Sequence, residues 1–283
     1  MTTPSAALRT ARARQRRGAF PILTATLRES QMLIAAACFY IVAIGLLVGL
    51  IFPAMTTIDL RSYIGNSAVG SLLGMRSLPE STFATYLAVE LYSSFFLLLF
   101  GGVLAYAAGA SIARNVEDGT IDLALARPVS RTRLYLEKWA ALLVGMVAIL
   151  GVSLLTGWAD TLIFSGATLN WRWFLLGHLE LVSLLLFVVG VGLLISAGAS
   201  GGRTAGGAAT AVVVVGYLAQ TFGTASDRLA FLKYLGPYFY APAGQVMVEQ
   251  RWAGTWQFLI PVTVGLLAGV VGLLVFRHRD ITA

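Results

Sequence analysis

The chain has 283 residues, of which 58% are hydrophobic and 12% charged, with a net charge of +7 and a mean hydropathy of +0.80. Soluble domains carry about 25% charged residues, so this composition excludes an ordinary soluble domain and a disordered chain. A single cysteine, Cys38, excludes an intrachain disulfide and a cysteine metal site. The sequence predicts an all-α polytopic membrane protein, in one transmembrane domain over residues 1–283.

Six apolar runs approach or exceed the roughly 20 residues that a helix needs to cross a bilayer. The first run has no charged residue and is followed by no small-residue cleavage site, so we interpret it as an uncleaved anchor rather than a signal peptide. The six predicted spans are 32–52, 91–112, 139–158, 174–199, 204–222 and 256–276.

An even number of spans places both termini on one side of the membrane, and the basic residues indicate which side. Fourteen of the 20 Lys and Arg residues lie on the side of the termini, most of them before the first span and between the second and third. Because basic segments stay in the cytoplasm, we expect both termini to be cytoplasmic, in an inner or plasma membrane. Several tryptophans near the predicted outer ends of spans support these boundaries.

The segment 1–31 combines a basic arm with a short apolar pattern. Phe20, Leu23 and Leu27 repeat at helical spacing beside Arg28 and Glu29, which predicts an amphipathic helix on the inner leaflet. The arginines ahead of it favour contact with anionic membrane lipid over the alternative of a nucleic-acid-binding arm, so we expect no nucleic acid partner.

Small residues recur four apart in three of the spans, which lines them along one helix face and lets helices approach closely. This pattern favours packing within one chain over the alternative of a subunit interface. The residues are Gly45 and Gly49; Gly101, Ala105 and Gly109; and Gly265 and Gly269.

The connection between the second and third spans, residues 113–138, predicts a short structured element. Gly119 ends the preceding helix, and Thr120 can cap a new one. That helix ends before Pro128, since proline disfavours helical geometry in the residue before it. Ser130 then caps a further helix that carries Arg131, Arg133 and Lys138 into the third span. The product is a short cytoplasmic helix that can press into a groove on another protein.

These residues, between the second and third of six spans, resemble the first cytoplasmic loop of the ABC-2 type permeases. Such permeases are the membrane subunits of ATP-binding-cassette transporters, mostly exporters. The outer segment 223–255 contains Pro237 in a stretch similar to the family's apolar, proline and aromatic segment, which commonly forms short re-entrant helices. The residues that carry the loop resemblance are Glu117, Gly119, Thr120, Pro128, Ser130, Arg131 and Lys138.

The resemblance implies a coupling helix that docks on a separate nucleotide-binding subunit. ATP-driven closure of two such subunits would rock two permease copies, expected to form a homodimer, between inward-open and outward-open states. Glu117, Gly119, Thr120, Pro128 and Arg131 would shape the docking element, with Ser130 beside them and Lys138 anchoring its exit. The alternative is that these residues only cap helices and set topology.

The chain has no phosphate-binding loop of its own, because no glycine-rich segment ends in Lys-Ser or Lys-Thr. We therefore expect no catalytic site, metal or cofactor in this chain, with ATP and Mg²⁺ bound by the partner subunit. The scarcity of charge in the middle of the spans suits an apolar or amphipathic cargo.

Ionisable groups near the outer ends of spans are candidate substrate or gating positions, and Glu90, His178 and Glu180 are of this kind, with Pro237 in the outer segment. The alternative is that water or headgroups reach all three charges there.

Two other classes of function remain open on the sequence. Gly198-Ala199-Ser200-Gly201 is similar to the serine motif of rhomboid proteases, but Ser200 and His278 lie at span ends, where nothing enforces a dyad. A secondary transporter would show inverted repeats and charges near the bilayer midplane, and we find neither.

Overall fold

The computed structural model describes residues 20–55, 82–120 and 129–279, and every regular element in these ranges is helical. Six of the described helices are long and apolar enough to cross a membrane. The predicted all-α polytopic fold is therefore confirmed. The six are α2 (Pro21–Met55), α6 (Ser94–Glu117), α8 (Arg131–Ile163), α9 (Trp171–Gly198), α10 (Gly202–Ala225) and α12 (Thr255–His278).

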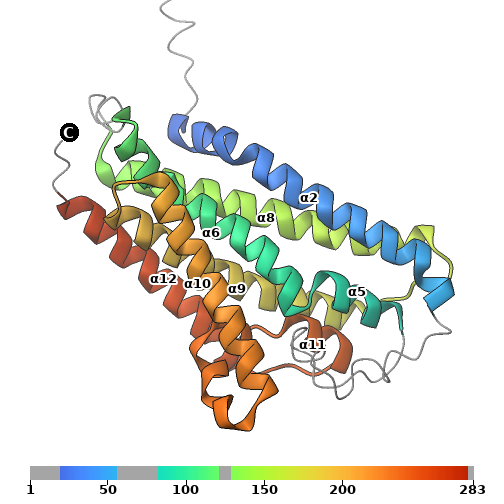
Figure 1. The fold of residues 1–283 in the computed structure, drawn as a ribbon. Helices are drawn as coiled ribbons and strands as arrows, with labels where there is room; N and C mark the ends of the chain where they lie inside the picture. The colour runs from blue at the N-terminus through green and yellow to red at the C-terminus, as the bar shows by residue number, and fades with distance from the viewer. Residues whose placement is uncertain (1–19, 56–81, 121–128, 280–283) are drawn as a thin grey trace, which may run out of the picture.

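The six helices form one elongated bundle (Figure 1). Helix α2 lies along α8, α10 lies along α6, and α12 lies along α9. Because α9 also contacts α6, α8 and α10, it is the central helix. The start of α2 and the end of α12 lie at the same end of the bundle, where α6 ends and α8 begins (Figure 1). We call this the α6–α8 end.

The opposite end carries the short elements. These are α5 (Phe83–Leu91), the 3₁₀ helices η1 (Asp227–Leu235) and η2 (Pro237–Phe239), and α11 (Ala243–Glu249). Pro237 is the first residue of η2, a position that needs no backbone N–H. Short helices thus occur in the segment 223–255, and their re-entry into a membrane stays a prediction.

The second span differs from the expected single helix over 91–112. A break at Tyr92 and Ser93 separates α5 from α6, so Glu90 belongs to a separate short helix. Ser93 has an extended backbone, with φ −71° and ψ 159°, and Tyr92 donates or accepts a 2.7 Å hydrogen bond with Ser153 Oγ. Hydropathy alone missed this break because the residues on both sides of it are apolar.

The first span also begins earlier than expected. Helix α2 is continuous from Pro21, so Leu23 and Leu27 belong to its first turns and not to a separate amphipathic helix. No glycine or proline lies between Pro21 and Gly45 to end the helix. The place of this segment on the inner leaflet stays a prediction, and the basic arm 1–19 lies outside the described residues.

The spaced glycines pack against neighbouring helices of the same chain. A Cβ atom on Gly265 would lie 2.5 Å from Leu186 O of α9, and one on Gly109 would lie 2.5 Å from Ala205 O of α10. Backbone-to-backbone approach this close leaves no room for a side chain. At these positions the structure supports packing within one chain.

Candidate functional site

Glu117 connects α6 to the start of α10. Its Oε2 accepts a 2.7 Å hydrogen bond from the backbone N–H of Gly202, the first residue of α10. The first N–H groups of a helix have no partner within the helix, and a carboxylate also complements the positive end of the helix dipole. Sequence reasoning assigned Glu117 to a docking surface and did not anticipate this bond inside the chain.

Glu137 makes the equivalent connection between α8 and the start of α2. Its Oε2 accepts hydrogen bonds from the backbone N–H groups of Ile22 at 3.0 Å and Leu23 at 3.1 Å. Its Oε1 accepts from Nε of Arg133, one turn earlier, at 2.8 Å. The side chain is buried, although Arg133 is half-exposed. Sequence reasoning missed Glu137; the only available signal was an acid four residues after a base, directly before a span.

Two arginines connect the other helix ends. Arg131 donates from Nη1 to the backbone oxygens of Arg279, at 2.5 Å, and Arg277, at 3.4 Å, where α12 ends. Arg279 donates from Nη1 to Ala197 O at 3.0 Å and Ala199 O at 2.7 Å, where α9 ends. Cationic groups stabilise helix C-termini, because unpaired carbonyls and the negative end of the dipole lie there.

Two further contacts join α6 to its neighbours. Lys138 donates from Nζ to Ser111 O of α6 at 2.6 Å, and Ser196 Oγ of α9 accepts from the backbone N–H groups of Ile112 and Ala113. Together these bonds connect α6 with α8, α9 and α10, α8 with α2 and α12, and α12 with α9. Every membrane helix is therefore linked, directly or through one neighbour, to the two helices that flank the α6–α8 connection.

Gly119 and Ser130 behave as predicted in this connection, whereas the predicted capping by Thr120 stays a prediction. Gly119 follows the end of α6 with φ +63°, a conformation that favours glycine. Ser130 accepts a 3.2 Å hydrogen bond from Arg133 N and caps α8, as predicted. Thr120 Oγ1 accepts from Nδ2 of Asn115 at 3.0 Å. The predicted short helix over 121–128, including Pro128, lies outside the described residues.

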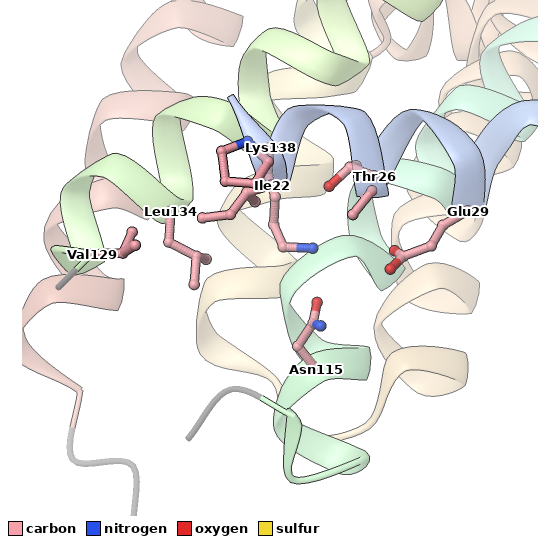
Figure 2. A pocket seen from close by; sticks show the side chains of 9 residues that line it. Ile22, Thr26, Glu29, Asn115, Val129, Leu134 and Lys138 are labelled. Atoms are coloured by element: carbon pink, nitrogen blue, oxygen red, sulfur yellow. The ribbon is translucent and has the colours of Figure 1, made fainter. Parts of the chain in front are cut away.

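A cavity of about 190 Å³ lies among α2, α6 and α8 beside Lys138 (Figure 2). Lys138 is only 3% exposed, and its side chain points into the same space as those of Asn115 and Glu29 (Figure 2). The remaining wall is mainly apolar. The lining residues are Pro21, Ile22, Ala25, Thr26, Glu29, Asn115, Val129, Leu134 and Lys138.

The ionisable residues predicted near the opposite end do not form one cluster. His178 is buried and already bonded: its Nε2 lies 3.0 Å from Ser153 Oγ and its Nδ1 lies 2.9 Å from Phe174 O. Glu180 is 0% exposed, and its carboxylate oxygens have no hydrogen-bond partner among the described residues. Glu90 is half-buried in α5.

Asp160 is a second buried carboxylate, and sequence reasoning missed it. It is 0% exposed, and neither side-chain oxygen has a partner in the described ranges. It faces α2, because a Cβ atom on Gly45 would lie 3.2 Å from Asp160 Oδ2. The expected third span ended at 158, which placed Asp160 in a loop, whereas α8 continues to Ile163.

The residues considered for other chemistry remain apart. His278 Nδ1 lies 2.9 Å from Leu274 O, and no hydrogen bond joins His278 to Ser200 within the described part of the chain. The same residues hold no group of three or more His, Cys, Asp or Glu side chains that could bind a metal ion.

A bundle of six helices that are long and apolar enough to cross a membrane defines a multi-pass membrane protein. A family model described as ABC-2 family transporter protein matches residues 26–281. The chain therefore belongs to the ABC-2 family of transporter proteins, as the loop resemblance predicted, and is a membrane permease component. Membership implies association with an ATP-binding subunit. No curated protein matches the chain.

Proposed function

We propose that this chain is the translocating subunit of an ABC exporter, driven by ATP hydrolysis on a separate nucleotide-binding subunit. The α6–α8 connection faces the cytoplasm and docks that subunit, which binds ATP and Mg²⁺. Family membership supports the permease role, and the basic residues near the chain termini support the orientation.

The observation that carries this proposal is the set of hydrogen bonds around the α6–α8 end. Glu117 and Arg131 flank the connection, and each bonds to the terminus of another membrane helix. A force applied to the connection by a closing ATPase would reach α10 through Glu117 and α12 through Arg131. Bonded helix ends move together, so the connection is suited to convert a local push into movement of the bundle.

We also propose that two copies of the chain work together, with the cargo path between them. Helices α2 and α12 support this arrangement, because only 28% of the residues in the most apolar 18-residue stretch of each helix are buried within the chain. Their remaining faces are available to lipid or to a second copy. Among the candidate cargo or gating positions, Glu180 has the strongest support. Its buried carboxylate has no hydrogen-bond partner among the described residues, which is costly unless the group serves a function.

A pair of Glu117 variants tests the coupling role. Glu117→Gln keeps an oxygen that can accept the bond from Gly202 N, whereas Glu117→Ala removes the acceptor. If Glu117 acts by holding α10, Ala lowers transport per ATP hydrolysed strongly and Gln only slightly. If it acts by charge on the partner surface, both variants lose the partner equally. The measurement is ATP-dependent transport in proteoliposomes, together with copurification of the ATPase subunit.

Asp118→Asn is the matched control, because Asp118 is the exposed acid next to Glu117. We expect it to leave both copurification and transport unchanged. Transport that continues without nucleotide, or normal coupling in Glu117→Ala, would contradict the proposal. Transport without nucleotide would instead identify the chain as a secondary transporter.

A further inference from the structure

The cavity beside Lys138 holds a positive group whose hydrogen-bonding capacity is only partly used. A lysine ammonium has three N–H donors, and Ser111 O is its one hydrogen-bond partner among the described residues. The side chain is 3% exposed, so bulk water does not surround the charge. A buried ammonium is costly unless it is paired, which favours an anionic group in the cavity.

The same cavity also presents acceptors. The Oδ1 atom of Asn115 is buried without a partner in the described part of the chain, while Nδ2 donates to Thr120. Glu29 lines the same cavity, and its carboxylate lies more than 4.0 Å from the Lys138 ammonium, so the two form no ion pair. The side chains of Asn115 and Glu29 point into the same space as Lys138 (Figure 2), and both offer oxygens that can accept from an ammonium on a ligand.

The cavity lies where a bilayer has its headgroups. Lys138 is the last charged residue of α8 before an uncharged stretch that reaches 159, and Glu29 is the last charged residue of α2, which ends at Met55. Such stretches are long enough to fill the hydrocarbon core, about 30 Å thick, so the two charges mark its boundary. Apolar side chains of Ile22, Val129 and Leu134 line the cavity beside them.

We propose that this cavity binds the headgroup of a phospholipid that carries both a phosphate and a primary ammonium, as phosphatidylethanolamine does. Lys138 donates to the phosphate, while Glu29 and Asn115 Oδ1 accept from the ammonium. Lys138 and Glu29 supply one charge of each sign to the cavity, as a zwitterionic headgroup requires, and the apolar wall lies beside the start of the acyl chains. Basic pockets between membrane helices bind lipid headgroups in this way. The site would fix the start of α2 against α6 and α8.

Native mass spectrometry of the full chain tests this site without ATPase partner or nucleotide, so its outcome does not depend on the proposed transport function. The probes are phosphatidylethanolamine and phosphatidylglycerol with identical acyl chains, added to delipidated protein. We expect phosphatidylethanolamine to bind about tenfold more tightly, the effect of one charge-assisted hydrogen bond. Lys138→Met weakens binding of both lipids about tenfold or more, and Glu29→Gln lowers the preference for phosphatidylethanolamine.

Two control variants remove a charge at the α6–α8 end from residues that do not line the cavity. Arg114→Met is the control for Lys138→Met, and Asp118→Asn is the control for Glu29→Gln. Lys138→Arg keeps the charge and retains binding, which separates loss of the site from loss of the fold. If Lys138→Met fails to fold, Glu29→Gln still tests the proposal, because Glu29 is exposed and its effect is measured as the preference between the two lipids.

Equal binding of the two lipids to the unaltered chain would overturn the proposal, and so would equal weakening by Arg114→Met and Lys138→Met. Competition with free phosphoethanolamine distinguishes a site for a membrane lipid from a site for a soluble zwitterion. If it displaces the lipid at comparable concentration, the cavity is a site for a soluble zwitterion, and the lipid assignment is wrong. If lipid binding survives a large excess, the acyl chains contribute as proposed.

Discussion

The contact between Glu137 and the start of α2 offers a direct test of how the helix ends are held. Glu137→Ala removes the acceptor for two backbone N–H groups, those of Ile22 and Leu23, together with the ion pair to Arg133. Glu137→Gln keeps one side-chain oxygen that can still accept a bond. Arg133→Ala removes the ion pair and leaves the Glu137 acceptor for Ile22 and Leu23 in place.

The three variants should differ in how much each destabilises the start of α2. A hydrogen bond to a charged group contributes about 1.5–3 kcal/mol, and loss of a helix N-cap costs about 1 kcal/mol and at most about 2. Water can reach the freed N–H groups of Ile22 and Leu23, because both residues are half-buried, so the N-cap range applies. We expect Glu137→Ala to cost about 2 kcal/mol and Glu137→Gln about 1. Arg133→Ala should cost less than about 1 kcal/mol, since Arg133 is 48% exposed and solvent screens the pair.

Hydrogen exchange in detergent measures this effect locally. About 2 kcal/mol of lost protection corresponds to roughly 30-fold faster exchange at the amides of Ile22 and Leu23. Amides in the middle of α9 should exchange as before, which shows that the change is local. The reasoning is refuted if Glu137→Ala leaves exchange within about threefold of the unaltered chain, or if Arg133→Ala accelerates it equally.

Two predictions concern packing inside the bundle. Gly265→Val should lower the thermal unfolding midpoint and the yield of folded protein, because its backbone contact with α9 leaves no room for a side chain, while Gly151→Ala, where nothing lies within 4 Å, should be neutral or slightly stabilising. An equal loss in both variants would contradict the packing argument. Ser153→Ala should cost about 1–3 kcal/mol, since it leaves both Tyr92 and His178 without their shared partner. Tyr92→Phe, which removes one bond only, should cost less in the same melting measurement, and the reverse order would show that Ser153 is not the bridge.

The α6–α8 connection shows how far sequence reasoning reaches at a functional site. The ends of its helices follow from local chemistry: Gly119 adopts the left-handed backbone that ends α6, and Ser130 caps α8, both as predicted. The partners of Glu117 and Arg131 do not follow from the sequence. Gly202 and Arg279 lie 85 and 148 residues away, and no local pattern indicates that these side chains meet them.

The difference between local and long-range information also explains why, of the two buried carboxylates at the opposite end, one was predicted and one was missed. Glu180 was a candidate because its position inside an apolar run is visible in the sequence. Asp160 was not, because hydropathy averaged over a window ended the third span at 158, whereas the helix continues to Ile163. Its side chain is fully buried and lies against α2 at Gly45, a contact that depends on how the two helices pack.

The sequence by itself determined that the chain crosses a membrane with six helices, and its loop pattern identified the family. Both depend on local properties: a bilayer requires long apolar helices, and turns and caps require particular residues at fixed spacing. The tertiary structure alone decided where α5 separates from α6, which helix ends are bonded to one another, and that a buried lysine faces a cavity. These features depend on residues distant in the chain that become neighbours only when the bundle packs.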